Sequence, residues 1–264
     1  MSFPMTGVPP VISGAENAKT TAWVNAVVAA GGSVSAGRRT IINSLFDSLD
    51  GSSLAPARLW LHAAENSQSA LIDLFALASA TAVNSPTFAA DQGYTGNGTS
   101  SYLNLNTINA GTQNSASFGV YLRTDKAARD EVDISASGAS ASHTSNLVAK
   151  WSDGNLYAAL NDNNSDGGRT APATVSGIYV ISRTGSTNFV VYRAGSSFAT
   201  VTLASSTVPN RNFCTLASIN EFGTAVLFSS AQYGMSFLGG AGWDATQAAN
   251  FTTHIQTYMT AVGA

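Results

Sequence analysis

The chain has 264 residues, enough for one large β domain or for one domain with a smaller appended piece. Only 10% of the residues are charged, against about 25% in typical soluble proteins, and 44% are hydrophobic. The net charge is −3 and the basic residues are spread along the chain, so there is no basic stripe for nucleic acid. No apolar run is long enough for a membrane span. We therefore expect neither nucleic acid nor membrane as a partner.

Residues 1–14 predict an extended N-terminal arm. They contain Pro4, Pro9 and Pro10 and show no helical period. They also lack the basic and apolar regions of a secretory signal peptide, so we expect none. An arm of this kind gains structure by lying along a neighbouring surface, which favours a docking role.

Residues 15–57 predict a helical hairpin. Trp23 and Val27 share one stripe of the first helix, and a pair of glycines follows it. Leu45 and Leu49 lie on the corresponding stripe of the second helix. Two amphipathic helices joined by a glycine turn form such a unit.

Residues 58–264 predict a mainly β domain, a two-layered sandwich. Short runs rich in β-branched and aromatic residues recur between Gly, Asn, Asp and Ser at the spacing expected of a sandwich or barrel. No helical segments alternate with them, so parallel βαβ units are not expected. The predicted strands are 59–62, 117–123, 131–135, 147–151, 155–160, 177–183, 188–195, 198–203, 213–219 and 233–239.

The last segment, 244–262, predicts a C-terminal amphipathic helix. Asp244 stands at the N-cap with Gln247 three residues later, which indicates a capping box, and Gly263 ends the helix. A single amphipathic helix after a sandwich is expected to cover a sheet face or edge.

The stretch 91–106, "DQGYTGNGTSSYLNLN", superficially resembles a phosphate-binding loop. A dinucleotide fingerprint needs a strand before its glycines and a helix after them. Here Gly93, Gly96 and Gly98 precede a strand in which Tyr102 alternates with leucines, and no Lys-Ser/Thr pair follows. The glycines are therefore expected to make turns, and no nucleotide cofactor is expected.

The same glycines lie within "SPTFAADQGYTGNGTSSYLNLN", which resembles the opening of concanavalin A-like, laminin G-like sandwich domains. A hairpin of that fold resembles "IYVISRTGSTNFVVYRAGSSFATVTL", although Ala194 replaces its usual Asn before Gly195. The chain is also similar to tailed-phage and prophage tail or virion-associated proteins in "AWVNAVVAAGGSVSAGRRTIINSLFDSL", "RLWLHAAENSQSALIDL" and "QTYMTAVGA". The resemblance covers about residues 20–264.

This resemblance implies a concanavalin A-like jelly-roll sandwich and a non-enzymatic structural protein displayed on a virion. We expect a capsid decoration protein or a tail or fibre component, present in multiple copies. It would dock through its N-terminal region onto other virion proteins.

Glycosidases on this type of sandwich carry a strand motif E-x-D-x-E, which "EVDIS" at 131–135 resembles in part. The resemblance would make Glu131 the nucleophile and Asp133 its helper, but Ser135 takes the place of the acid/base. A hydroxyl cannot protonate a leaving group effectively near neutral pH. We therefore expect no catalytic residues, and we expect Glu131 and Asp133 to face solvent on an edge strand.

The remaining nucleophilic or ligating side chains give no catalytic pattern. His62, His143 and His254 lie in unrelated contexts without a G-x-S-x-G elbow, so structural or surface roles are expected. Cys214 is the only cysteine and lies in an apolar run, which predicts a small buried side chain.

A calcium loop is a further alternative at "DNNSDGG". Asp162, Asn164 and Asp166 could supply oxygen ligands, with Gly167 at the sharp turn. The closing Glu is missing, because Ala173 stands at the twelfth position, and an ordinary hairpin turn has the same composition. We expect no bound metal.

The alternative function is a carbohydrate-binding module that recognises a host-surface glycan. Sugar sites stack an aromatic ring on the pyranose and surround its hydroxyls with amides or carboxylates. Trp151 and Tyr157, with Asp153 and Asn155, are candidate members, although aromatic residues in a sandwich more often belong to the core.

Overall fold

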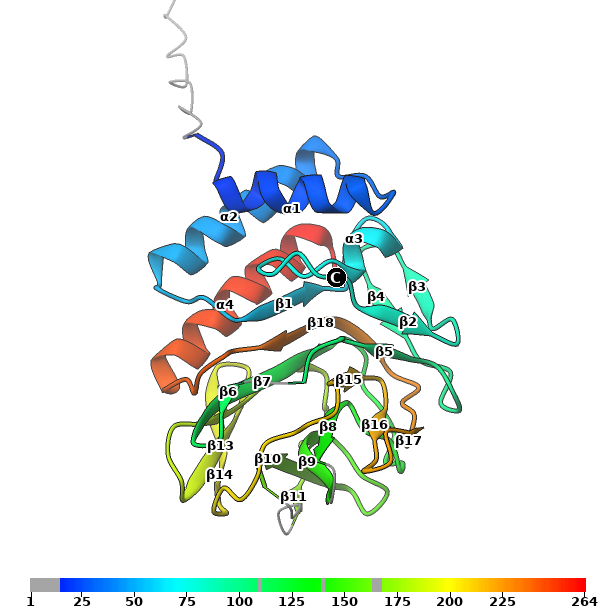
Figure 1. Ribbon diagram of the computed structural model, residues 1–264, viewed down its shortest axis with the longest axis vertical. Coiled ribbons are helices and arrows are strands. Elements are labelled where there is room, and N and C mark those ends of the chain that lie inside the picture. The colour runs from blue at the N-terminus through cyan, green and yellow to red at the C-terminus, as the bar shows by residue number, and fades with distance from the viewer. Residues whose placement is uncertain (1–14, 109–110, 139–140, 163–167) are drawn as a thin grey trace, which may run out of the picture.

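The protein is represented by a computed structural model that describes residues 15–108, 111–138, 141–162 and 168–264. These residues form a two-layered β-sandwich with helices packed on one side of it (Figure 1). The expected mainly β sandwich with helices towards both ends of the chain is therefore confirmed. The arm predicted at 1–14 lies outside the described residues.

One layer is an antiparallel sheet of nine strands within the described ranges. Its order is β14 (Ser196–Thr202), β13 (Asn188–Arg193), β12 (Gly177–Arg183), β7 (Ser115–Leu122), β18 (Gln232–Leu238), β4 (Gly93–Thr95) and β3 (Thr87–Ala89), with β1 (Arg58–Leu61) paired to β18 and β6 (Gly111–Thr112) paired to β7. In β1, Leu59 lies opposite Phe237 of β18.

The other layer is an antiparallel sheet of seven strands in the part of the chain that the structure describes. Its order is β11 (Arg169–Thr170), β10 (Asn155–Leu160), β9 (Ala141–Val148), β8 (Ile134–Gly138), β15 (Cys214–Thr215), β5 (Tyr102–Asn104) and β2 (Thr81–Val83). A small hairpin of β16 (Ser218–Ile219) and β17 (Ala225–Val226) lies on its outer face, where the Ile219 amide donates to the Ser135 hydroxyl at 3.0 Å.

Strand alternation divides the apolar side chains between two cores. Trp60 of β1 joins the core between the sheets, with Phe118 and Leu147. Its neighbours Leu59 and Leu61 point the other way, into a second core beneath the helices. The nine-stranded sheet is therefore buried on both faces.

The helices are α1 (Ala18–Ala29), α2 (Ala36–Gly51), α3 (Ser67–Leu71) and α4 (Ala245–Val262). The helix α4 covers the outer face of the nine-stranded sheet, where Phe251 packs against Phe237. The predicted hairpin α1–α2 packs beside α4, with Trp23 and Phe46 in the same core (Figure 1). The Arg38 guanidinium of α2 donates to the Tyr258 hydroxyl of α4 at 2.7 Å. The apolar stripes of the hairpin therefore pack against other elements of the same chain.

Local signals place the helix ends and turns as predicted. The Gln247 amide donates to Asp244 at 2.8 Å, and the Asp244 amide donates to Gln247 at 3.0 Å, which completes the capping box. Gly93 has a φ of +103°, and a Cβ on Gly96 would lie 2.0 Å from the Ser229 carbonyl oxygen. The glycine loop therefore makes turns and a close backbone approach, as expected.

Two predicted strands differ from the structure. Of 131–135, only Ile134 and Ser135 belong to β8, because the preceding residues form a connection whose carboxylates turn into the protein. The predicted strand 213–219 is broken at Leu216, whose φ of +74° is incompatible with extended backbone. The chain there separates into β15 and β16.

Candidate functional site

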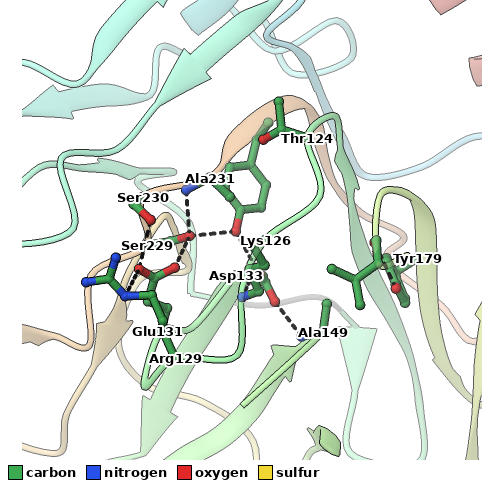
Figure 2. A network of polar contacts seen from close by, with 12 residues as sticks. Thr124, Lys126, Arg129, Glu131, Asp133, Ala149, Tyr179, Ser229, Ser230 and Ala231 are labelled. Atoms are coloured by element: carbon green, nitrogen blue, oxygen red, sulfur yellow. Dashed lines mark hydrogen bonds and ion pairs between the residues drawn. The ribbon is translucent and has the colours of Figure 1, made fainter. Parts of the chain in front are cut away.

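The acidic segment takes part in a network of polar contacts (Figure 2), and its carboxylates are buried. The Asp133 carboxylate is fully buried and accepts from Lys126 Nζ at 2.6 Å. It also accepts from the Tyr233 hydroxyl and the Ala149 backbone amide. Burial, with the Asp133 charge beside it, raises the pKa of Tyr233 well above its usual value, so this phenol stays a donor.

The Glu131 carboxylate is 3% exposed. It accepts from the Ser230 hydroxyl at 2.9 Å and from the Ser229 hydroxyl at 3.4 Å, and pairs with Arg129 Nε at 3.3 Å (Figure 2). We call Lys126, Glu131, Asp133, Ser229 and Tyr233 the acid cluster.

The expectation that Glu131 and Asp133 face solvent on an edge strand is wrong. Donors from the connections before β8 and β18, far apart in sequence, surround them and compensate their burial. Ser135 is also buried, but its hydroxyl meets the β16–β17 hairpin through Ser218 at 3.3 Å. All four carboxylate oxygens of Glu131 and Asp133 accept hydrogen bonds from the protein, and these bonds hold segments that are distant in sequence against one another.

Two of the histidines have structural neighbours. His62 is fully buried, with its ring nitrogens 3.0 Å from the Ala70 carbonyl oxygen and 3.0 Å from the Ser236 hydroxyl. Burial lowers the pKa of His62 to about 4. His254 contacts the Ser52 hydroxyl at 2.8 Å, and partial burial lowers its pKa. The side chain of His143 lies outside the described residues.

The sequence-predicted sugar residues come together at the turn between β9 and β10. The Tyr157 hydroxyl donates to Asp153 at 2.7 Å, and this bond together with the Asn155 amides lowers the pKa of Asp153. Asn155 Nδ2 donates to the same carboxylate at 3.1 Å. Tyr157 and Trp151 are both partly exposed rather than core residues. The polar groups of this turn largely satisfy one another.

The calcium alternative falls mainly on Asn164, Asp166 and Gly167, which lie outside the described residues. Within the described ranges, no three His, Cys, Asp or Glu side chains are grouped closely enough to hold a metal ion.

A polar pocket of about 180 Å³ lies on the outer face of the seven-stranded sheet. We use the name polar pocket for the hollow lined by Tyr102, Asn104, Arg211, Asn212, Cys214, Ile219 and Gly223. It lies between β5 and β15 on one side and the β16–β17 hairpin on the other. A hollow of this size suits a single small ring, since drug-sized ligands need about 300 Å³ or more.

Strand alternation explains how β5 supplies this pocket. Leu103 points into the core between the sheets, so Tyr102 and Asn104 face outward. Cys214 pairs with Asn104 across the strands and, buried as predicted, lines the pocket. Burial raises the pKa of Cys214, so its thiol stays neutral.

The polar groups of the pocket are short of partners inside the protein. Among the described residues, the Tyr102 hydroxyl and the Asn212 amide make no intramolecular hydrogen bond, and neither does the Asn104 Nδ2 group. The Arg211 guanidinium donates one hydrogen bond to the described protein, from Nη2 to the Glu221 carbonyl oxygen at 3.2 Å, and its Nε is buried without a partner. Hydroxyl, amide and guanidinium donors therefore converge on one small hollow.

An exposed aromatic residue precedes one of the pocket residues in the chain. Phe222 is 79% exposed at the tip of the β16–β17 hairpin, next to the pocket residue Gly223. The Asn220 side chain accepts from the backbone amides of Phe222 at 3.0 Å and Thr224 at 2.9 Å. The turn is therefore fixed by its own hydrogen bonds while the ring is displayed.

Sequence reasoning missed this pocket. The sequence pattern predicts only a strand at Tyr102 and Asn104, and it gives no signal for the pair Arg211–Asn212. The available signal was the outward register of β5, with polar residues on both sides of an inward leucine. The partner strand β15 lies more than 100 positions later, and no local pattern connects the two.

No helix among the described residues is both long and apolar enough to cross a membrane. No known family model matches the sequence, and no curated protein matches it by sequence.

Solved structures do match the fold. A Trypanosoma rangeli sialidase in complex with 2,3-difluorosialic acid (covalent intermediate) superposes with a TM-score of 0.55 at 10% identity, over 84% of this chain and 40% of that one. A mutant of that sialidase displaying trans-sialidase activity gives 0.52 at 12% identity, over 85% and 40%. The botulinum neurotoxin serotype D binding domain gives 0.52 at 11%, over 77% and 51%. The chain thus spans about two fifths of these sialidases, and the similarity establishes a shared β-sandwich fold.

Proposed function

We propose that the protein is a carbohydrate-binding module and that the polar pocket is its glycan site. The observation that carries the proposal is the convergence of Tyr102, Asn104, Arg211 and Asn212, which keep a hydroxyl, two side-chain amide groups and a guanidinium Nε without partners inside the described protein. Sugar recognition uses such donors around the hydroxyls and an aromatic ring against the pyranose face. The sialidase with a similar fold was solved with 2,3-difluorosialic acid, which gives a sugar ligand a precedent in that protein.

We propose a non-catalytic role, which the chemistry of the acid cluster supports. Retaining hydrolysis needs one carboxylate free to attack and one carboxyl free to donate a proton. In the acid cluster, Asp133 accepts from Lys126, Tyr233 and a backbone amide, and Glu131 accepts from two serines. These bonds support a structural role for both carboxylates. Display on a virion is a separate prediction from the sequence resemblance, which particle purification and immunolabelling would test.

A glycan array probed with the full chain tests the proposal. The expected result is binding by the wild-type protein, loss of binding by Tyr102→Ala, and retention by Tyr157→Ala. Tyr157 is the matched control, because it is a partly exposed tyrosine on the same sheet at the β9–β10 turn. Thermal melting of each variant confirms that it is folded. Loss of glycan binding in Tyr157→Ala but not in Tyr102→Ala would show that the site lies at the β9–β10 turn instead. Absence of binding to any glycan would refute the proposed function.

A further inference from the structure

Arg211 is the charged side chain of the polar pocket. Its Nε is buried without a hydrogen-bond partner, and its Nη2 donates to the neutral backbone carbonyl of Glu221. Nε is therefore a charged hydrogen-bond donor without a partner inside the described protein, and an anion in the pocket would satisfy it. Lys126, by contrast, is a buried cation whose ammonium group pairs with the Asp133 carboxylate.

The guanidinium is also positioned by its surroundings. A Cβ built on Gly223 would lie 3.8 Å from both Cζ and Nε of Arg211, which is an ordinary contact distance, so the β16–β17 turn lies against the guanidinium. Gly223 has a φ of +82°, a conformation that glycine adopts without strain. The Glu221 carbonyl oxygen fixes Nη2 from the same turn. A guanidinium held in place matches the two oxygens of a carboxylate in a fork geometry.

We propose that the polar pocket selects acidic sugars, with Arg211 binding the carboxylate of the sugar. This inference rests on the proposed function. The ring hydroxyls are met by the Asn104 and Asn212 amides and by Tyr102. The net charge of the protein is −3, so general electrostatic attraction does not bring anions to it and selectivity depends on the local guanidinium. Because the carboxylate and the guanidinium are both charged, their hydrogen bonds are about twice as strong as neutral ones.

The test is calorimetric or NMR titration of the full chain with four probes: α-methyl glucuronide, its uncharged methyl ester, α-methyl glucoside and acetate. We expect the glucuronide to bind about tenfold tighter than the ester or the glucoside, with acetate weakest. Arg211→Met should remove this preference and leave the weak binding of the neutral sugars. Arg39→Met, which removes the same charge from α2 on the helical side of the molecule, should leave it unchanged.

The outcomes separate this inference from the proposed function. Equal affinity for glucuronide, ester and glucoside, or a preference that survives Arg211→Met, overturns the acidic-sugar inference while glycan binding stands. Acetate binding as tightly as glucuronide also overturns it, because the pocket would then take simple anions. If no sugar binds at all, the proposed function fails together with the inference. Circular dichroism and thermal melting of each variant exclude misfolding as the cause.

Discussion

The acid cluster and the polar pocket are both built from polar residues associated with the seven-stranded sheet, but they differ in whether those polar groups find hydrogen-bond partners within the protein. In the acid cluster, Asp133 is fully buried and its carboxylate accepts three hydrogen bonds from the protein. In the polar pocket, the Arg211 Nε is buried without any partner. A polar group whose partners come from its own chain serves the fold, since unsatisfied burial is costly. A polar group left without a partner at a surface hollow is available to a ligand.

The largest expected effect comes from breaking the acid cluster. Asp133→Ala removes the partner of Lys126 and leaves a buried ammonium uncompensated, so the free energy of unfolding should fall by about 3–5 kcal/mol. Urea denaturation measures this. Asp130→Ala, an exposed residue three positions earlier, is the control and should change the value by less than about 0.5 kcal/mol. A small loss for Asp133→Ala would mean that the acid cluster is not saturated as described.

A second effect concerns pH and the buried His62. Its pKa is lowered from 6.5 to about 4 in the folded protein, so the unfolded chain binds more protons between these values. Stability contributed by the neutral imidazole is complete above pH 6.5 and is lost as the pH falls towards 4, by an amount on the order of 3 kcal/mol. Urea denaturation across this window should show the slope, and His62→Gln should flatten it.

The half-buried His254 gives the matched comparison for this pH effect. Its pKa is also lowered by burial, so it acts in the same direction, and His254→Gln should alter the slope less than His62→Gln does. An unchanged slope in His62→Gln would contradict the assignment. The expected effect on glycan binding is nil, because His62 contacts Ala70 and Ser236 and not the pocket.

Much of the fold could be predicted from local sequence patterns. The stripe of Trp23 and Val27, the capping box of Asp244 and the run at 177–183 each determine their structure within a few residues. The acid cluster could not be predicted, because "EVDIS" alternates as an exposed strand would, and only Lys126 and the Ser229–Tyr233 segment show that its carboxylates are buried. The polar pocket also depends on distant pairing, between Asn104 and Cys214.

An intermediate effect is expected from Glu131→Gln. The amide keeps the shape of the side chain but loses the charge that strengthens the bonds from Ser229 and Ser230, so stability should fall by about 1–2 kcal/mol. The loss is smaller than for Asp133 because the cationic partner of Glu131, Arg129, is 60% exposed and already solvated. Affinity for α-methyl glucuronide should be unchanged. Loss of binding in a folded Glu131→Gln protein would show that the acid cluster reaches the ligand.

The smallest effect on stability should come from Phe222→Ala. Because the ring is 79% exposed and the Asn220 side chain holds the turn through backbone amides, the free energy of unfolding should change by less than about 0.5 kcal/mol. A ring beside the polar pocket can stack on a sugar bound there, so affinity should fall by about threefold to tenfold. Val208→Ala, at another partly exposed apolar side chain, is the control and should leave affinity unchanged. If Phe222→Ala binds glycans as the wild type does, the ligand does not extend beyond Gly223, and recognition is confined to the pocket itself.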